Sequence, residues 1–82
     1  MAWTYILKST VVQKTYVGST TDLERRLAEH NSGKHTFTKR YSPWIVVYSE
    51  EVANLGLARK REKYLKSAAG RRFIRQKEII PR

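Results

Sequence analysis

Two short segments near the N-terminus, residues 3–7 and 14–18, combine aromatic and β-branched side chains as β-strands do. Roughly five polar or mixed residues separate them, a length that suits a hairpin loop. Because side chains alternate between the faces of a strand, Tyr5 is expected on one face of the first strand and Tyr16 on one face of its partner. Gly18 is expected to free the backbone for the turn that leaves the hairpin. Such a hairpin commits the chain to a mostly antiparallel sheet.

After the hairpin the hydrophobic pattern changes to a helical period. Thr21 and Glu24 form a capping-box pattern, in which each side chain can satisfy a backbone donor near the other residue. The helix is therefore predicted to begin near Asp22. It is predicted to end near Gly33, where glycine supplies the left-handed C-terminal turn.

The same helix carries polar side chains on its predicted inner face. Arg25 and Glu29 are spaced to pair in solvent on the outer face. The inner stripe, at positions i, i+3, i+4 and i+7, consists of Leu23, Arg26, Leu27 and His30.

The rest of the chain completes a layered fold. A polar, basic loop is expected over 33–43, and the apolar run 44–49 predicts a strand buried on both faces. A helix is predicted over 55–69, capped by Gly70, and a short third helix over 71–80. The order β-β-α-β-α-α describes a small α/β (α+β) sandwich with helices flanking a three-stranded, mostly antiparallel sheet.

Length and composition predict one soluble domain. The chain of 82 residues suits a single domain over 1–82, with a core in 3–67 and a basic C-terminal helix or tail over 70–82. Cysteine is absent, which is compatible with a reducing cytosol. No signal-peptide pattern and no apolar stretch of membrane-spanning length occur in the sequence. We therefore expect a cytoplasmic location.

Positive charge is concentrated in the final third of the chain. The net charge is +10, and residues 59–82 hold ten basic residues against two acidic ones. The expected partner is a polyanion, DNA or possibly RNA, because neutralising phosphates releases counterions. Two alternatives are a simply solvated basic helix and an anionic membrane surface, of which the membrane is disfavoured. The candidate nucleic-acid contacts are Lys14, Lys34, Lys39, Arg40, Arg71, Arg72 and Arg75.

Glu62 is the most unusual polar residue in the predicted core. It lies on or beside an apolar helical stripe, where a carboxylate is costly unless it is paired or coordinated. One alternative is a salt bridge to Arg26. The other is a metal site, since a single carboxylate with water and substrate phosphate is a common way to hold Mg²⁺.

Inward polar groups accumulate in this small domain. His30 alone would more often be a hydrogen-bonded core residue than a catalyst, but Arg26 beside it also needs an anion. Together with Glu62 they form the kind of polar cluster found in active sites. Tyr5 and Tyr16 gain significance only from this cluster, because strand tyrosines usually serve packing.

Read together, these positions resemble the GIY-YIG nuclease domain over most of the chain, from Trp3 to about Ser67. Trp3-Thr4-Tyr5 keeps the tyrosine of the first motif, and Tyr16-Val17-Gly18 is a conservative match to the second. The segment 18–30 is similar to the family's first-helix signature, and Ala58 to Glu62 is similar to the segment that carries its glutamate. The chain is most similar to small stand-alone bacterial members.

The resemblance implies a metal-dependent endonuclease that hydrolyses DNA with little sequence specificity. It implies one Mg²⁺ or Mn²⁺ ion on Glu62, a phosphate contact for Arg26, and Tyr5 as the base, with Tyr16 and His30 in support. Two alternatives stay open: a weak or inactive nucleic-acid-binding module that kept the fold, and an RNA-binding or RNA-processing factor. The candidate catalytic residues are thus Tyr5, Tyr16, Arg26, His30 and Glu62.

Overall fold

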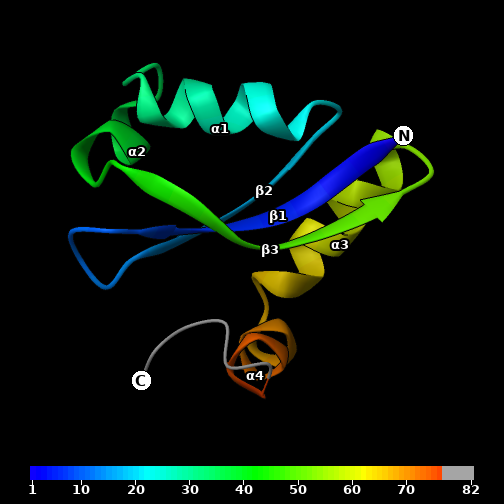
Figure 1. The fold of residues 1–82 in the computed structure, drawn as a ribbon. Helices are drawn as coiled ribbons and strands as arrows, with labels where there is room; N and C mark the ends of the chain where they lie inside the picture. Colours follow the sequence, from blue (N-terminus) through cyan, green and yellow to red (C-terminus); the bar gives the residue numbers. More distant parts are fainter. Residues whose placement is uncertain (77–82) are drawn as a thin grey trace.

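The computed structural model describes residues 1–76 and confirms the predicted α+β sandwich, in which helices cover both faces of a three-stranded antiparallel sheet (Figure 1). The predicted order holds, with one short additional helix, α2, inside the segment predicted to be a loop. The strands are β1 (Ala2–Ser9), β2 (Thr15–Thr20) and β3 (Trp44–Val52), and the helices are α1 (Leu23–Asn31), α2 (Thr36–Arg40), α3 (Leu55–Leu65) and α4 (Ala68–Gln76).

The central strand is β1, and both of its neighbours are antiparallel to it in the order β2-β1-β3. The prediction that the segment 44–49 is buried on both faces was wrong, because β3 lies at an edge and Ile45 is 48% exposed. The doubly buried strand is β1, in which residues 4–7 are all buried. An unbroken apolar run therefore did not identify the central strand.

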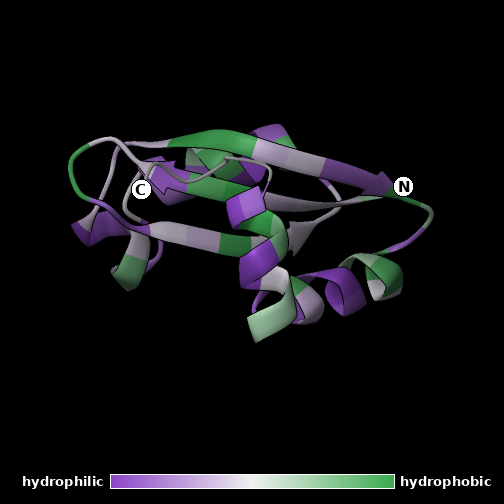
Figure 2. Cartoon of the chain, turned by 90° about the horizontal axis from the view of Figure 1, so that it is seen from below, coloured by the Kyte–Doolittle hydropathy of each residue, from purple (hydrophilic) through white to green (hydrophobic). Residues whose placement is uncertain are grey.

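Each face of the sheet has its own hydrophobic core. On one face Tyr5, Leu7 and Trp44 pack with Tyr16 and with leucines of α1. On the other face Ile6 packs with Leu65 of α3 and Ile74 of α4. Figure 2 shows hydrophobic residues gathered along the strands and in bands on the helices, as this three-layer arrangement requires. The alternation predicted for the hairpin is confirmed, because Tyr5 and Tyr16 share one core.

Several element ends differ from the sequence prediction. The N-cap of α1 is Asp22, whose side chain accepts a hydrogen bond from the Arg25 backbone N–H, and not Thr21. Gly33 does adopt the predicted left-handed conformation, with φ of 87°. Gly18 does not form the exit turn predicted for it, because β2 continues to Thr20.

Helix α4 packs as part of the core. The predicted helix 55–69 ends earlier, as α3 at Leu65, and the predicted third helix begins earlier, as α4 at Ala68. Gly70 is therefore not a cap but a buried residue inside α4, where it lies against the backbone of Leu65. Ile74 is only 3% exposed. Helix α4 is therefore an integral layer and not a tail. The predicted helix end near residue 80 lies outside the described residues.

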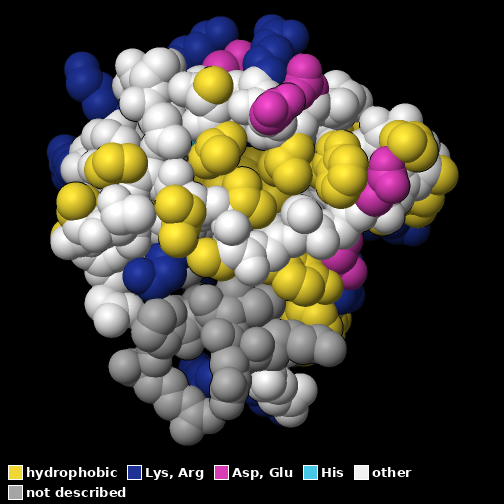
Figure 3. All heavy atoms as spheres, viewed as in Figure 1, with side chains coloured by type: hydrophobic (Ala, Val, Ile, Leu, Met, Phe, Trp, Pro, Cys, Tyr) yellow, Lys and Arg dark blue, Asp and Glu magenta, His cyan; other side chains and the backbone are white. Residues whose placement is uncertain are grey.

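The face shown in Figure 3 carries a broad hydrophobic patch with Lys and Arg mainly at its rim. A cavity of about 460 Å³ is lined by Trp3, Leu23, Leu27 and Val46, together with polar residues at the start of α1. Within residues 1–76, none of the helices combines the length and apolarity that a membrane span needs.

Candidate active site

A buried hydrogen-bonded chain runs from β1 to α2 through the histidine of α1. The Tyr5 hydroxyl lies 3.1 Å from His30 Nε2, and His30 Nδ1 lies 2.9 Å from Thr38 Oγ1. The Thr38 hydroxyl donates to the carbonyl of His35, so it must accept from the Nδ1–H of His30. His30 Nε2 is then the acceptor, and the phenol of Tyr5 donates to it.

Burial keeps both of these groups neutral. Tyr5 is 2% exposed, and burial, with a smaller effect of Tyr16, raises the pKa of its phenol well above the ordinary value. Burial also lowers the pKa of His30 from 6.5 to about 4, helped by electrostatic interactions with His35 and Arg26. A neutral imidazole accepting from a neutral phenol is therefore the stable arrangement near pH 7.

Tyr16 lies at the outer side of this buried pair. Its ring centroid is 4.8 Å from that of His30 and 6.4 Å from that of Tyr5, and Tyr16 itself is only partly buried. The Lys66 ammonium lies 5.9 Å from the centroid of the Tyr16 ring. Tyr16 therefore connects the buried Tyr5–His30 pair to the end of α3.

Glu62 approaches the same region from α3. One carboxylate oxygen accepts from the Ser19 hydroxyl at 2.6 Å, and the other accepts from Lys66 Nζ at 2.6 Å. The alternative of a salt bridge between Glu62 and Arg26 is not seen among the described residues, where Arg26 contacts Glu29 instead. The Glu62 side chain is 23% exposed, so one of its partners can be replaced from solvent.

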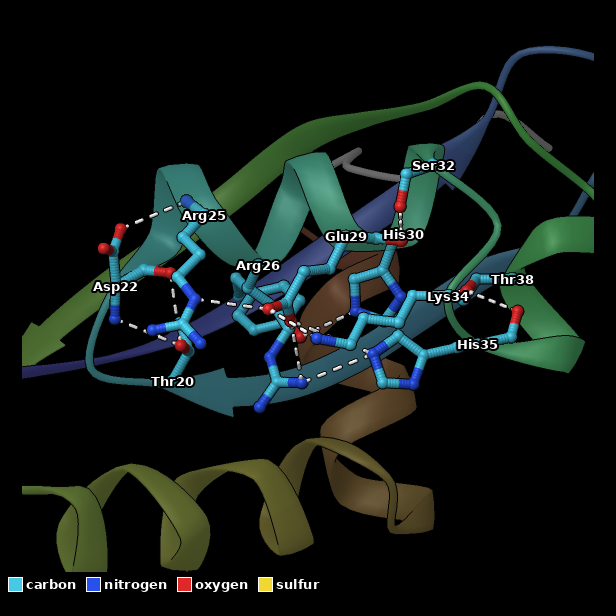
Figure 4. A network of polar contacts seen from close by, with 11 residues as sticks. Thr20, Asp22, Arg25, Arg26, Glu29, His30, Ser32, Lys34, His35 and Thr38 are labelled. Atoms are coloured by element: carbon cyan, nitrogen blue, oxygen red, sulfur yellow. Dashed lines mark hydrogen bonds and ion pairs between the residues drawn. The ribbon is translucent and has the colours of Figure 1, made fainter.

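The guanidinium of Arg26 belongs to a polar cluster beside α1, shown in Figure 4. Its Nη1 lies 3.4 Å from Glu29 Oε1 and 3.4 Å from His35 Nε2. These side chains line a cavity of about 310 Å³ together with residues 20–22 at the start of α1. Arg26 is 35% exposed and remains available to an anion from solvent.

Glu29 organises this cluster, although the sequence placed it on the outer, solvated face. It pairs with Arg25 as predicted, at 3.2 Å, and also with Arg26, Lys34 and His35. Partial desolvation acts to raise the pKa of Glu29, but Lys34 and Arg25 outweigh it and hold the pKa below its ordinary value. The carboxylate is therefore a charged anchor for the surrounding cations.

The five candidate catalytic residues thus fall into three groups: the two tyrosines with His30, Glu62, and Arg26. Tyr5, Tyr16 and His30 are in mutual contact, while Glu62 reaches Tyr16 through Lys66. No hydrogen bond or ion pair joins Arg26 to Glu62 within residues 1–76, but the charge of Arg26 acts on both Tyr5 and His30.

The predicted nucleic-acid contacts are distributed around these groups. Lys34 is partly engaged by Glu29, and the Lys14 ammonium lies 5.3 Å from the centre of the Tyr41 ring. Arg71 lines a groove beside Tyr16. The remaining four are exposed on α2 and α4, namely Lys39, Arg40, Arg72 and Arg75.

Four residues of the site were not identified from the sequence. Lys66 carried a signal, because it follows Glu62 at i+4 on one helix. Ser19, His35 and Thr38 carried none, since their roles depend on contacts between separate elements.

Among the described residues no group of three or more His, Cys, Asp or Glu side chains could hold a metal ion by itself. Glu62 offers a single carboxylate to an ion, and its two oxygens accept hydrogen bonds from Ser19 and Lys66. This set fits only an ion that takes most of its ligands from water and substrate.

Comparison with known proteins identifies the family. The sequence model of the GIY-YIG catalytic domain matches residues 1–76. A UPF0213 protein of Staphylococcus haemolyticus is 37% identical over 65 residues, which cover 78% of this chain and 73% of the relative. A UPF0213 protein of Syntrophus aciditrophicus is 42% identical over 67 residues, covering 78% and 75%. A UPF0213 protein of Lactococcus lactis is 37% identical over 78 residues, covering 94% and 74%. No solved structure matches the chain significantly.

The relatives' names say nothing about activity, so the functional information comes from the family match. That match indicates a nuclease-type function and a nucleic-acid substrate. Because the family model matches every described residue, this protein belongs to the GIY-YIG family, and residues 1–76 correspond to its catalytic domain.

Proposed function

We propose that the protein is an endonuclease that hydrolyses DNA phosphodiester bonds with one Mg²⁺ or Mn²⁺ ion and low intrinsic sequence specificity. The observation that carries this proposal is the position of Tyr16. Its ring packs beside His30 and lies within 5.9 Å of the ammonium of Lys66, the partner of Glu62. A substrate bound over Tyr16 would meet groups suited to proton transfer, phosphate binding and metal binding.

Glu62 is the residue that would hold the ion. It offers a partly exposed carboxylate whose second oxygen is shared with the displaceable ammonium of Lys66. The bound ion would supply positive charge to the phosphate and lower the pKa of a coordinated water. The hydrogen bond from Ser19 fixes the orientation of the carboxylate.

Burial divides the roles of the two tyrosines. We assign contact with the attacking water to Tyr16, because it is the more accessible ring, and a positioning role to Tyr5. Tyr5 is fully buried and already donates to His30, so its proton is held away from solvent. His30 supports the rings of both tyrosines and is itself oriented by Thr38.

Arg26 would contact the scissile phosphate. Its guanidinium is held by Glu29 and His35 without being enclosed, so it can present free N–H donors to an anion. A charge held in place before the substrate arrives stabilises the developing negative charge without reorganisation.

Low specificity follows from how the charge is presented. The net charge of +10 resides on Lys and Arg side chains that suit phosphates of any sequence. The alternative of a nucleic-acid-binding module without useful catalysis has one observation in its favour, since the Lys66 ammonium already neutralises the Glu62 carboxylate.

Nicking of supercoiled plasmid with Mg²⁺ or Mn²⁺ tests the proposal. We expect metal-dependent nicking by the parent protein and none by Glu62→Gln, while Glu50→Gln retains it. Glu50 is a matched control because it is also half-buried and ion-paired, at 2.8 Å to Arg61, but lies outside the site. Equal nicking by the parent and Glu62→Gln would refute the assignment, and DNA binding without nicking by the parent would establish the binding module.

A further inference from the structure

A groove runs along the outer side of Tyr16. Its volume is about 520 Å³, and its walls come from β2, α2, the residue after α3, and α4. The lining residues are Thr15, Tyr16, Val17, Phe37, Lys66 and Arg71. The groove therefore joins the candidate active site to α4, an element that the proposed chemistry does not use.

Phe37 is the unusual residue in this groove. It is 49% exposed, yet its ring packs beside two others: Trp44, stacked at 6.5 Å between centroids, and Tyr41, edge-on at 5.4 Å. Its centroid lies 6.3 Å from that of Tyr16. An exposed aromatic ring fixed in place by a buried tryptophan is a preformed flat surface for another ring.

Positive charges lie next to the two rings. Lys66 Nζ is 5.9 Å from the centroid of Tyr16, and Arg71 lines the same groove from α4. Aromatic rings alternating with cations are the pattern that binds single-stranded nucleic acid, because bases stack on the rings and phosphates pair with the cations. A base within a duplex cannot use Phe37 in this way, since its faces are covered by its neighbours.

We propose that this groove binds an unpaired nucleotide, whose base stacks on Phe37 and whose flanking phosphates contact Lys66 and Arg71. The inference rests on the proposed function and names its substrate class: nucleic acid that is single-stranded, or locally unpaired, beside the bond to be cut. The chemistry is shared by DNA and RNA, which the test below separates.

The experiment measures binding of fluorescent 12-nucleotide single-stranded DNA, its RNA equivalent and the matching DNA duplex by anisotropy, in EDTA and with the full chain. We expect the parent to prefer single strands over the duplex. Phe37→Leu should weaken single-strand binding at least fivefold, since the stacking of one base contributes at least that factor to affinity. Duplex affinity should change less than twofold, and Phe37→Trp should restore the preference.

Leu57→Ala is the matched control, because Leu57 is 45% exposed on α3 but lies outside the groove. Circular dichroism and melting temperature show whether Phe37→Leu folds. If it does not, Phe37→Trp alone tests the inference, because that variant should show the preference for single strands. Comparison of the two single strands shows whether DNA or RNA is favoured. Equal loss of single-strand and duplex affinity in Phe37→Leu, or no loss of either, overturns the inference.

Arg71 and Arg72 provide a second, independent comparison. They are adjacent on α4, but only Arg71 lines the groove. Arg71→Ala should reduce the salt dependence of single-strand binding by roughly 0.7 in slope, as loss of one phosphate contact does, and Arg72→Ala should reduce it less. Equal slopes for the two variants would contradict the proposed path of the strand.

Failure of this inference is distinguishable from failure of the nuclease proposal. Binding in EDTA requires no catalysis, so a Phe37-dependent preference can hold in a protein that never nicks DNA. Conversely, metal-dependent nicking that needs Glu62 but does not depend on Phe37 would support the nuclease proposal and contradict nucleotide binding in the groove.

Discussion

Gly18 lies directly across the β1–β2 ladder from Tyr5, and the phenol of Tyr5 occupies the space that a side chain at position 18 would enter. A β-carbon at Gly18 would lie 2.5 Å from the Tyr5 hydroxyl oxygen and 2.7 Å from Cζ. Glycine is therefore required here by the close approach of a ring, in a strand with an ordinary backbone. The glycine of the second motif creates room for the tyrosine of the first.

The first prediction tests this relationship. Gly18→Ala should lower the free energy of unfolding by about 1 to 3 kcal/mol, because the buried Tyr5 ring cannot move without losing His30. Denaturant unfolding measures the change. Gly56→Ala is the control and should have a smaller effect, since a β-carbon there would contact only Asn54, at 3.2 Å. Equal stability of Gly18→Ala and the parent would show that the ring adapts freely.

The second prediction separates the two tyrosines. Tyr16→Phe should reduce nicking by at least tenfold with little change in stability, since the Tyr16 hydroxyl makes no hydrogen bond within residues 1–76 that the change would remove. Tyr5→Phe should lower stability by about 1 to 3 kcal/mol, because the buried Nε2 of His30 loses its donor. Plasmid nicking and thermal unfolding of both variants test this assignment. A loss of nicking in Tyr5→Phe, with nicking kept in Tyr16→Phe, would identify Tyr5 as the base.

The third prediction concerns pH. The pKa of His30 is about 4 in the folded protein and 6.5 as the ordinary value, so the unfolded state binds a proton more readily. The stability that neutral His30 contributes is complete above pH 6.5 and is lost as the pH falls toward 4. Glu29, whose pKa is lowered from 4.5, loses its contribution only below pH 4.5. Denaturant unfolding between pH 7 and 4.5 should show a free energy of unfolding that falls as the pH is lowered, and this dependence should be weaker in His30→Gln. An unchanged pH dependence in that variant would exclude His30 as its source.

The fourth prediction concerns the ion pair of Lys66 with Glu62. If a metal ion competes with the Lys66 ammonium, Lys66→Met should tighten binding of Mn²⁺ by about two- to fivefold, the value of a partly exposed ion pair. Titration calorimetry of the DNA-free protein measures this directly. Lys63→Met, on the same helix and exposed, is the control. Weaker Mn²⁺ binding in Lys66→Met would argue that Lys66 supports the site and does not compete.

The sequence predicted the elements whose signal is local. The hairpin, the inner stripe of α1 with His30, and the order of strands and helices all follow from periodicity and turn residues. The position of β3 could not be predicted, because an apolar run reads the same at an edge as at the centre. The break between α3 and α4 was predicted at Gly70 but lies between Leu65 and Ala68, since no proline marks it and Gly70 serves close packing inside α4.

The candidate site divides in the same way. Residues named by motif spacing, such as Tyr16 and Glu62, were found, but their partners were not. Ser19 and Thr38 act across element boundaries, where a single sequence gives no signal. The accessibility of the two tyrosines, on which we base their proposed roles, became visible only when β1 proved to be the central strand.

The last prediction compares Arg25 and Arg26, adjacent residues that both contact Glu29. Arg25 is 73% exposed and outside the contacts of Tyr5 and His30, whereas Arg26 is 35% exposed and its charge acts on both. Arg26→Ala should therefore abolish nicking while binding of duplex DNA falls by less than about threefold, since one phosphate contact among many is lost. Arg25→Ala should keep its activity and change stability by no more than about 0.5 kcal/mol. Arg26→Lys adds a sharper test, because it keeps the charge but not the planar pair of donors, and it should recover binding without recovering nicking. Full activity in Arg26→Lys would mean that charge alone suffices at this position, and an essential Arg25 would mean that the phosphate enters from the outer face of α1.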